Sequence, residues 1–321
     1  MPYKLAMQTV ITDDFSRSIV SRSVVTIGNF DGVHRGHREV FAQVRRQADL
    51  LSVPAVVLTF DPHPLKILDP DRAPRLITTQ RQKRALIAES DIDLLLVIPF
   101  TRSFATTSAE EFVRTVLCRC LGVRSLVIGH DYAFGRGREG NEALLGRLGR
   151  ELGFDLIALD PVGDAELLFS SSAVRRLIGQ GAVADVIAML GRCHRIVGQV
   201  VKGRMIGRSL GFPTANMMTD NELIPADGVY AVWVEAKGEL HQGACSIGTN
   251  PTFEGGEHTI EAFLFDFFDD LYAQEIVVHF AERLRDIARF SDAGQLMAQI
   301  TRDVEQCRSI LSAGLPVRTS L

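Results

Sequence analysis

Short apolar runs, many of them rich in β-branched residues, alternate with longer amphipathic segments over the first 160 residues. The expected strands are 23–28, 55–60, 94–100, 125–129 and 155–160, and the helical segments between them are 36–51, 78–90, 108–121 and 141–152. Ser108 and Glu111 have the spacing of a capping box, which indicates that a helix begins there. This alternation predicts a parallel sheet covered by helices on both faces, with ligands at the carboxyl ends of its strands.

The pattern changes after about residue 185. From Arg195 onward, strand-like runs separated by Gly, Pro, Asn and Asp turns occupy 195–203, 228–238, 239–248, 259–267 and 275–284, and a long amphipathic segment follows at 291–311. These features are typical of a small antiparallel β-barrel with a C-terminal helix. Because 321 residues also exceed what one hydrophobic core usually organises, we expect two domains, 1–185 and 186–321.

Composition narrows the classes of partner. With 46% apolar and 23% charged residues, the chain resembles ordinary folded proteins, and its net charge of −4 argues against broad electrostatic binding to nucleic acid or anionic lipid. No apolar run approaches the roughly 18 residues that span a bilayer, and the N-terminus lacks the pattern of a secretion signal. Five scattered cysteines without a CxxC pair indicate reduced structural thiols. We therefore expect a cytoplasmic protein whose partners are small molecules.

The strongest local signal is TIGNFDGVHRGH, residues 26–37, where a strand ends and a helix begins across a turn. Gly28 and Gly32 allow the backbone to approach a ligand closely, and the helix start offers N–H groups and a partial positive charge to phosphate. The imidazoles of His34 and His37 add donors that can stabilise charge on an α-phosphate as pyrophosphate departs. Taken alone, two histidines three residues apart more often share a helix face or bind a metal, but the preceding strand and turn favour nucleotidyl transfer.

The segment GNFDGVHRGH resembles the start of the nucleotidylyltransferase module in bacterial riboflavin kinase/FAD synthetases. FDPHPLKIL, IGHDYAFGRGREGN and FSSSAVRRLIGQG follow in that family's order. The resemblance implies that this module transfers an adenylyl group from ATP to FMN and releases pyrophosphate to give FAD. It implies ATP binding by Gly28, Asn29, Phe30, Asp31, Gly36, Ser171, Ser172 and Arg175, with the last three on the triphosphate, and FMN contacts by Asp131 and His63.

Two details of this module have alternatives. Ser172 stands where the family usually has Thr, and both residues supply a hydroxyl. Arg175 suits a charge-assisted contact to the leaving pyrophosphate, whereas without the motif it would equally be a solvated helix arginine.

Two glycine-rich segments match other nucleotide motifs only superficially. Residues 135–140 fit GxGxxG, but five residues separate them from the preceding strand, whereas the dinucleotide fingerprint needs its glycines directly after the first strand. Residues 203–209 are one residue too short for a P-loop and lack its lysine. We therefore expect neither type of site.

The segment GQVVKGRMIGRSLGFPTANM, residues 198–217, resembles the flavokinase signature of the same enzymes. Thr214 and Asn216 lie two residues apart, so in an extended segment both side chains project to one side and can offer oxygens to Mg²⁺ and nucleotide phosphate. An isolated PTAN would be a polar turn. DGVYAVWVE, SIGTNPTF and TIEAFLFDFFDDLYAQE match the flavokinase module in order, and LRDIARFSD resembles its flavin-side flap.

Glu261 is the residue that this resemblance marks as the general base for the 5′-hydroxyl of riboflavin. The resemblance also implies a flavin contact by Arg285. Without the resemblance, Glu261 would be interpreted as a salt-bridged strand glutamate and Arg285 as a surface arginine. Phe268-Asp269 and Ala273 depart from the family, which often has Asp-Gly and usually has Gly at these turn positions.

The resemblance extends from about Thr26 to Leu311 and implies a bifunctional enzyme that converts riboflavin to FMN and FMN to FAD, with ATP and Mg²⁺. We expect no covalent intermediate, because no Ser/His/Asp or Cys/His set suits one. One alternative is that the first domain transfers nucleotidyl groups to another phosphate, which a product assay with FMN and ATP tests. The other is a flavin-binding or regulatory protein without activity, and against it argues the presence of His34, His37, Thr214, Asn216 and Glu261. No motif indicates the oligomeric state.

Overall fold

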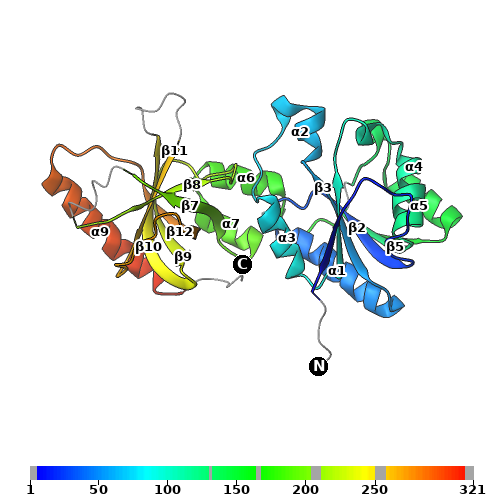
Figure 1. The fold of residues 1–321 in the computed structure, drawn as a ribbon, viewed down its shortest axis with the longest axis horizontal. Helices are drawn as coiled ribbons and strands as arrows, with labels where there is room; N and C mark the ends of the chain where they lie inside the picture. Colours follow the sequence, from blue (N-terminus) through cyan, green and yellow to red (C-terminus); the bar gives the residue numbers. More distant parts are fainter. Residues whose placement is uncertain (1–5, 130–131, 164–167, 204–210, 250–257, 315–321) are drawn as a thin grey trace. The chain divides into compact units, whose positions relative to one another are not determined.

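The computed structural model describes residues 6–129, 132–163, 168–203, 211–249 and 258–314. The chain forms two compact units, one built from Met1–Arg75 and Gln80–Phe169 and the other from Leu76–Thr79 and Ser170–Ser320 (Figure 1). Our expected domain boundary lay after residue 185. The compact units divide earlier, because helices α6 (Ser171–Gly179) and α7 (Val183–Leu190) pack on each other and α7 packs on strands of the second unit. The boundary between the functional domains stays a prediction.

Six parallel strands form the sheet of the N-terminal unit, in the order β1-β4-β3-β2-β5-β6. They are β1 (Gln8–Ile11), β2 (Ser23–Ile27), β3 (Ala55–Asp61), β4 (Leu94–Pro99), β5 (Val123–Gly129) and β6 (Asp155–Leu159). The helices of this unit are α1 (Arg35–Leu51), α2 (Pro64–Leu68), α3 (Gln80–Ala88), α4 (Ala109–Phe112) and α5 (Glu142–Leu152), with shorter turns η1 (Pro70–Arg72), η2 (Phe104–Thr106) and η4 (Arg136–Arg138).

Both faces of this sheet are covered, as predicted. Neighbouring residues of β2 point to opposite faces. Val24 belongs to a core with residues of α1 and α3, whereas Val25 belongs to a second core with residues of α4 and α5. The parallel sheet covered on both faces is therefore confirmed.

Two local features of the N-terminal unit differ from expectation. Strand β1 was not predicted, because its four residues are mostly exposed and carry no apolar alternation. The predicted helix start is confirmed, since Ser108 is the N-cap and its Oγ accepts a hydrogen bond of 3.2 Å from the N–H of Glu111. The chain then continues past α4 as a π-helix, η3 (Val113–Cys120), where an α-helix was expected. The buried residues of α4 and η3 still recur every three or four positions, so hydrophobic spacing did not distinguish the two helix types.

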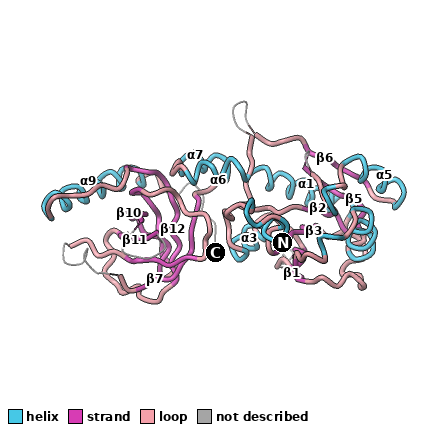
Figure 2. Tube along the Cα trace, turned by 90° about the horizontal axis from the view of Figure 1, so that it is seen from above, coloured by secondary structure: helices cyan, strands magenta, loops and turns pink. Residues whose placement is uncertain are grey.

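The C-terminal unit contains a closed antiparallel barrel with the strand order β10-β11-β8-β7-β12-β9. The strands are β7 (His194–Val201), β8 (Ala215–Thr219), β9 (Gly228–Ala236), β10 (Glu239–Thr249), β11 (His258–Leu264) and β12 (Glu275–Arg285). Tyr230, Val232 and Phe280 belong to the barrel core. Helix α9 (Ala293–Leu311) lies at one side of the barrel (Figure 2) and contacts β9, β10 and β12, where Cys307 and Leu311 pack in a separate apolar cluster. The predicted barrel and C-terminal helix are confirmed, although β8 was anticipated only as an extended segment.

Candidate active sites

The predicted phosphate loop connects β2 to α1 at the carboxyl edge of the parallel sheet. Phe30, Gly32 and Val33 have positive φ angles of 48°, 79° and 40°, so the backbone turns sharply. Gly28 has no room for a side chain, because a Cβ there would lie 2.8 Å from the ring of Phe30. The glycines thus allow the loop to fold tightly over a buried aromatic ring.

His34 and His37 form a stacked pair at the start of α1. Nδ1 of His34, the N-cap residue, accepts a hydrogen bond of 3.4 Å from the N–H of His37, and the ring centroids lie 3.6 Å apart at an interplanar angle of 22°. Because Nδ1 accepts, the ring hydrogen of a neutral His34 lies on Nε2. Gly36 allows this arrangement, since a Cβ there would lie 3.1 Å from the His34 ring. The HxGH spacing therefore supplies a cap, a stacked pair and the space that the pair needs.

Phe30 and Asp31 are buried beneath the loop. The ring of Phe30 packs edge-on against His37, with centroids 5.2 Å apart, and against Phe41, with centroids 4.8 Å apart. Phe30 therefore supports the histidine pair from within the core. The predicted ATP contacts of Phe30 and Asp31 stay predictions.

A buried lysine that we did not predict contacts this loop. Nζ of Lys83 donates hydrogen bonds of 3.2 Å to the carbonyl oxygen of Asn29 and to Oγ1 of Thr59. The sequence contained a signal for it, because Lys83 precedes Leu86 and Ile87 by three and four residues and therefore lies on the apolar face of α3.

His63 lies at the end of β3, where its Nδ1 accepts a hydrogen bond of 3.2 Å from the N–H of Leu65 and caps α2. Its predicted contact with FMN stays a prediction, and Asp131 lies outside the described residues. Residues 135–140 form a loop closed by a bridge between Phe134 and Gly140, which differs from the strand-to-helix junction of a dinucleotide fingerprint. Most of the P-loop-like segment, residues 204–209, lies outside the described residues.

Ser171, Ser172 and Arg175 lie in the first two turns of α6. This helix is capped by Ser170, whose Oγ accepts a hydrogen bond of 3.2 Å from the N–H of Ala173. Their predicted place on the triphosphate of ATP stays a prediction, because α6 belongs to the second compact unit.

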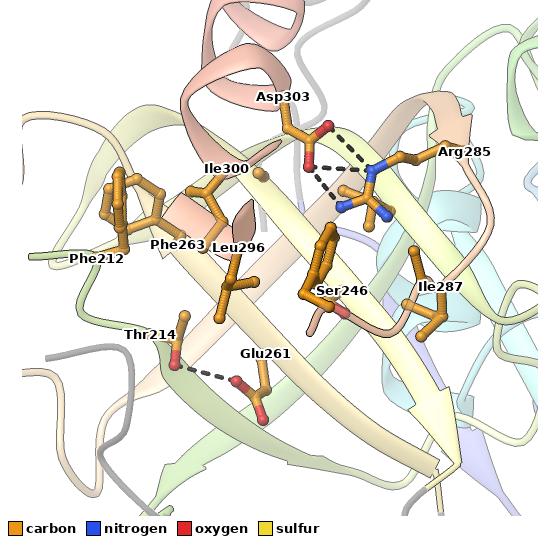
Figure 3. Close-up of a pocket in the computed structure, with 14 residues that line it drawn as sticks. Phe212, Thr214, Ser246, Glu261, Phe263, Arg285, Ile287, Leu296, Ile300 and Asp303 are labelled. Atoms are coloured by element: carbon orange, nitrogen blue, oxygen red, sulfur yellow. Dashed lines mark hydrogen bonds and ion pairs between the residues drawn. The ribbon is translucent and has the colours of Figure 1, made fainter. Parts of the chain in front are cut away.

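The C-terminal unit contains a cavity of about 430 Å³ lined by barrel strands, by α9 and by the segment that joins them (Figure 3). Its lining is apolar apart from Thr214, Ser246, Glu261, Arg285 and Asp303. Ile287, Ala288 and Phe290 line it from the segment that resembles a flavin-side flap. An apolar cavity with a few convergent polar groups suits a largely apolar small molecule that carries a few polar groups.

Strand pairing brings the predicted kinase residues together. Asn216 in β8 and Ser246 in β10 each lie directly opposite Glu261 in β11, so the three side chains share one face of the sheet. Oγ1 of Thr214 donates a hydrogen bond of 3.2 Å to Oε2 of Glu261, and Figure 3 shows the two side chains pointing toward each other. Gly203 fits beside Asn216 because a Cβ there would lie 2.0 Å from the amide nitrogen.

Arg285 lines the same cavity but is bound to α9. Its Nε and Nη2 donate hydrogen bonds of 3.0 Å and 2.7 Å to Oδ1 and Oδ2 of Asp303, and Gln299 donates one of 2.8 Å to Oδ1. The predicted flavin contact of Arg285 stays a prediction. Asp303 was missed, although it lies four and eight residues before the buried Cys307 and Leu311 and hence on the buried face of α9.

The donor set at Glu261 suits a hard cation. Beside it, Thr214 and Asn216 supply hydroxyl and amide oxygens, which Mg²⁺ takes as ligands together with phosphate oxygens. Within the part of the chain that the structure describes, no group of three or more His, Cys, Asp or Glu side chains could hold a metal ion.

Comparison with known proteins finds relatives of both units. The family model described as FAD synthetase matches residues 16–173, and the one described as riboflavin kinase matches residues 190–311. A bifunctional riboflavin kinase/FMN adenylyltransferase from Escherichia coli strain K12 is 38% identical over 294 residues, which are 91% of this chain and 94% of that protein. A protein of the same name from Pseudomonas fluorescens is 37% identical over 288 residues, which are 89% and 92% of the two chains.

A solved structure supports the fold. It is described as a macrolide-efflux protein from Streptococcus pneumoniae, is 32% identical, and superimposes with a TM-score of 0.86 over 94% of this chain and 98% of that chain. None of the helices in the described ranges is long and apolar enough to cross a membrane.

Proposed function

Because this chain belongs to the family of bifunctional riboflavin kinase/FMN adenylyltransferases, we propose a role for each residue that its two candidate sites bring together. The enzyme phosphorylates riboflavin to FMN in its C-terminal module and adenylylates FMN to FAD in its N-terminal module. The observation that supports our assignment of the kinase residues is the 3.2 Å hydrogen bond between Thr214 and Glu261 in the apolar cavity.

In the kinase reaction, Glu261 accepts the proton of the riboflavin 5′-hydroxyl as its oxygen attacks the γ-phosphorus of ATP. A new O–P bond forms FMN, the bond from the γ-phosphorus to the bridging oxygen breaks, and ADP leaves. The hydrogen bond from Thr214 fixes the orientation of the carboxylate. Mg²⁺ bound by Thr214 and Asn216 would neutralise charge on the phosphates. The hydroxyl of Thr214 can serve both partners because it has one donor and two acceptor positions.

We place the flavin ring against the apolar lining of the cavity. Phe263 and Phe290 line it, and Arg285 and Asp303 lie at its other polar end. A planar ring with polar edges is matched by aromatic walls and by a guanidinium whose orientation the carboxylate of Asp303 fixes.

In adenylyl transfer, a phosphate oxygen of FMN attacks the α-phosphorus of ATP, the bond to the pyrophosphate oxygen breaks, and pyrophosphate leaves. We assign Nε2 of His34 and the imidazole of His37 to the α-phosphate oxygens, because both rings lie at the N-terminus of α1, where backbone N–H groups also favour an anion. Ser171, Ser172 and Arg175 are proposed for the leaving phosphates on the basis of the motif alone.

A product assay tests these roles. The purified chain is incubated with riboflavin, ATP and Mg²⁺, and the flavins are resolved by chromatography over time. We expect His37→Ala to stop at FMN and Glu261→Gln to leave riboflavin unconsumed while still making FAD from added FMN. Glu282→Gln, on an exposed strand position of the same barrel, should behave as wild type. A Glu261→Gln enzyme that phosphorylates riboflavin at the wild-type rate would exclude Glu261 as the base.

We further propose that the enzyme works in the cytoplasm on small-molecule substrates. All five cysteines are free thiols, and four of them are buried, which fits a reducing compartment. The chain's net charge of −4 supports small molecules rather than nucleic acid as its partners.

A further inference from the structure

Lys83 is a buried lysine that has no role in the two reactions as described above. Only 6% of its surface is exposed. Burial disfavours its charged form and lowers its pKa to about 8, while the carboxylates of Asp31 and Asp61 oppose this shift and Arg84 adds to it. Burying a charged ammonium group costs free energy, so a lysine in this position indicates that its contacts have a specific function.

The ammonium group of Lys83 has three protein partners. Nζ donates to the carbonyl oxygen of Asn29 and to Oγ1 of Thr59, both at 3.2 Å, and to the carbonyl oxygen of Phe60 at 3.4 Å. Thr59 in turn donates to the same carbonyl of Asn29 at 3.2 Å. Because an ammonium group carries three N–H donors, these contacts use all of them and leave none for a substrate phosphate. Lys83 must therefore act through the backbone that it binds.

The backbone that Lys83 binds is the first part of the phosphate loop. Asn29 directly precedes Phe30, and Phe30 and Val33 both have φ angles in the left-handed region, at 48° and 40°. Residues other than glycine adopt this conformation only where their surroundings enforce it. The carbonyl of Asn29, held by Lys83 and Thr59, fixes the end of the loop that leaves β2, and His34 follows at its other end.

We infer that Lys83 is a positioning residue for adenylyl transfer, which holds the phosphate loop through the carbonyl of Asn29 and so places the His34–His37 pair against the α-phosphate of ATP. This inference rests on the role proposed for the two histidines. In a purely structural role, by contrast, Lys83 would stabilise the sheet, and the rate of adenylyl transfer would not depend on the N–H donors of Lys83.

Lys83→Met keeps most of the side-chain length and removes every donor. We expect kcat for FMN adenylylation to fall about 10- to 100-fold, because small misplacements of reacting groups cost this much. The KM for ATP should change less than about threefold, since an interaction realised in the transition state is lost from kcat. Riboflavin phosphorylation by the same molecules should stay at the wild-type rate and serves as the internal control. Thr59→Val, which removes one hydroxyl from the same set of contacts, should show the same pattern with a smaller loss.

The Lys83→Arg variant distinguishes an effect on the position of the phosphate loop from an effect on the stability of the fold. Arginine retains N–H donors but overfills a buried site, so its unfolding temperature should be no higher than that of Lys83→Met, whereas its adenylylation rate should be higher. Arg46→Met removes an exposed basic residue that pairs with Glu39 on α1, and it should match wild type in both measurements.

The inference is overturned if the adenylylation rates of the variants follow their unfolding temperatures instead of the donors that they retain. Wild-type kcat in Lys83→Met or, should that variant not fold, in Thr59→Val would overturn it as well. His37→Ala tests the underlying proposal separately, because a His37→Ala enzyme that still makes FAD refutes the histidine role whatever the Lys83 variants do.

Discussion

The side chains of Thr214 and Glu261 are joined by a hydrogen bond of 3.2 Å although they lie 47 positions apart in the chain. Thr214 directly precedes β8, and Glu261 lies in β11, which pairs with β8. The pairing of β8 with β11 therefore brings the end of the segment before β8 next to Glu261. It makes one hydroxyl a partner of the proposed base and a ligand for the proposed cation.

Thr214→Val should remove both functions of that hydroxyl without changing the volume of the side chain. We expect kcat for riboflavin phosphorylation to fall about 100-fold, within the range that general-base catalysis contributes. Formation of FAD from added FMN should not change, and Thr214→Ser should recover most of the kinase rate. Steady-state assays of the two half-reactions check this, and kinase activity in Thr214→Val equal to that of Thr214→Ser would contradict it.

Asp303→Asn should weaken riboflavin binding through Arg285. The carboxylate holds the guanidinium by three hydrogen bonds from Nε and Nη2, and because a hydrogen bond to a charged group contributes about 1.5 kcal/mol or more, we expect the KM for riboflavin to rise at least about tenfold. Arg308→Gln, in the same helix as Asp303, breaks an exposed pair with Asp266, which follows β11, and should leave KM unchanged. If Asp303→Asn lowers only the free energy of unfolding, the pair is structural.

Lys83 should make stability and adenylylation respond to pH in opposite directions. Its pKa of about 8 in the folded chain lies below the usual 10.5, so the cost of burying its charge is present at pH 8 and below and is relieved as pH rises toward 10.5. Relative to Lys83→Met, the free energy of unfolding of the wild type should rise over this window by up to ~3 kcal/mol.

Over the same window, loss of the proton removes one N–H donor from the contacts of Lys83, so adenylylation by the wild type should decline as pH rises through about 8. Lys83→Met should lack both effects, and the kinase rate of the same preparation provides the reference. Urea unfolding and kcat for adenylylation, both measured from about pH 8 toward 10.5, check the expected rise in stability and the expected decline in rate. A wild-type rate that declines in parallel in both half-reactions would assign the decline to another group.

Ala273→Gly should stabilise the barrel. Ala273 has a φ angle of 59° and is exposed, so glycine relieves a penalty of roughly 1–2 kcal/mol without losing packing. The greater freedom of glycine in the unfolded chain offsets about 0.4–1 kcal/mol of this, which leaves a net gain of about 0.5–1 kcal/mol. Ala298→Gly, at an exposed position within α9, should instead cost about 1 kcal/mol. Chemical unfolding of both variants shows whether each substitution raises or lowers the free energy of unfolding.

The parts of the structure that were predicted from sequence are those that local chemistry determines. The turn from β2 to α1 could be predicted because Gly28, His34 and Gly36 each meet a requirement set by residues within a few positions. β1 could not, because its pairing with β4 joins segments more than eighty residues apart and its own side chains carry no apolar pattern.

In the candidate sites, too, residues within local motifs were predicted, whereas residues that depend on distant partners were not. Thr214, Asn216 and Glu261 were identified by motif, whereas Ser246 enters the site only through its pairing with Glu261. Lys83 and Asp303 were missed for another reason: each is a charged residue on an apolar helix face, and its partner lies on a different element. Hydrophobic spacing indicated that these positions are buried but not which groups they meet.

The alternation of side chains along β11 has a consequence for folding. Glu261 points to the cavity, whereas its neighbour Ala262 is fully buried in the barrel core. If β11 paired with β8 one residue out of step, these faces would exchange, and a carboxylate would enter the hydrocarbon core at a large cost in free energy. The register that places the proposed base is thus the same one that permits the barrel to close. Folded preparations should therefore contain no molecules with a misplaced base, and losses of activity through mispairing should appear as losses of soluble protein.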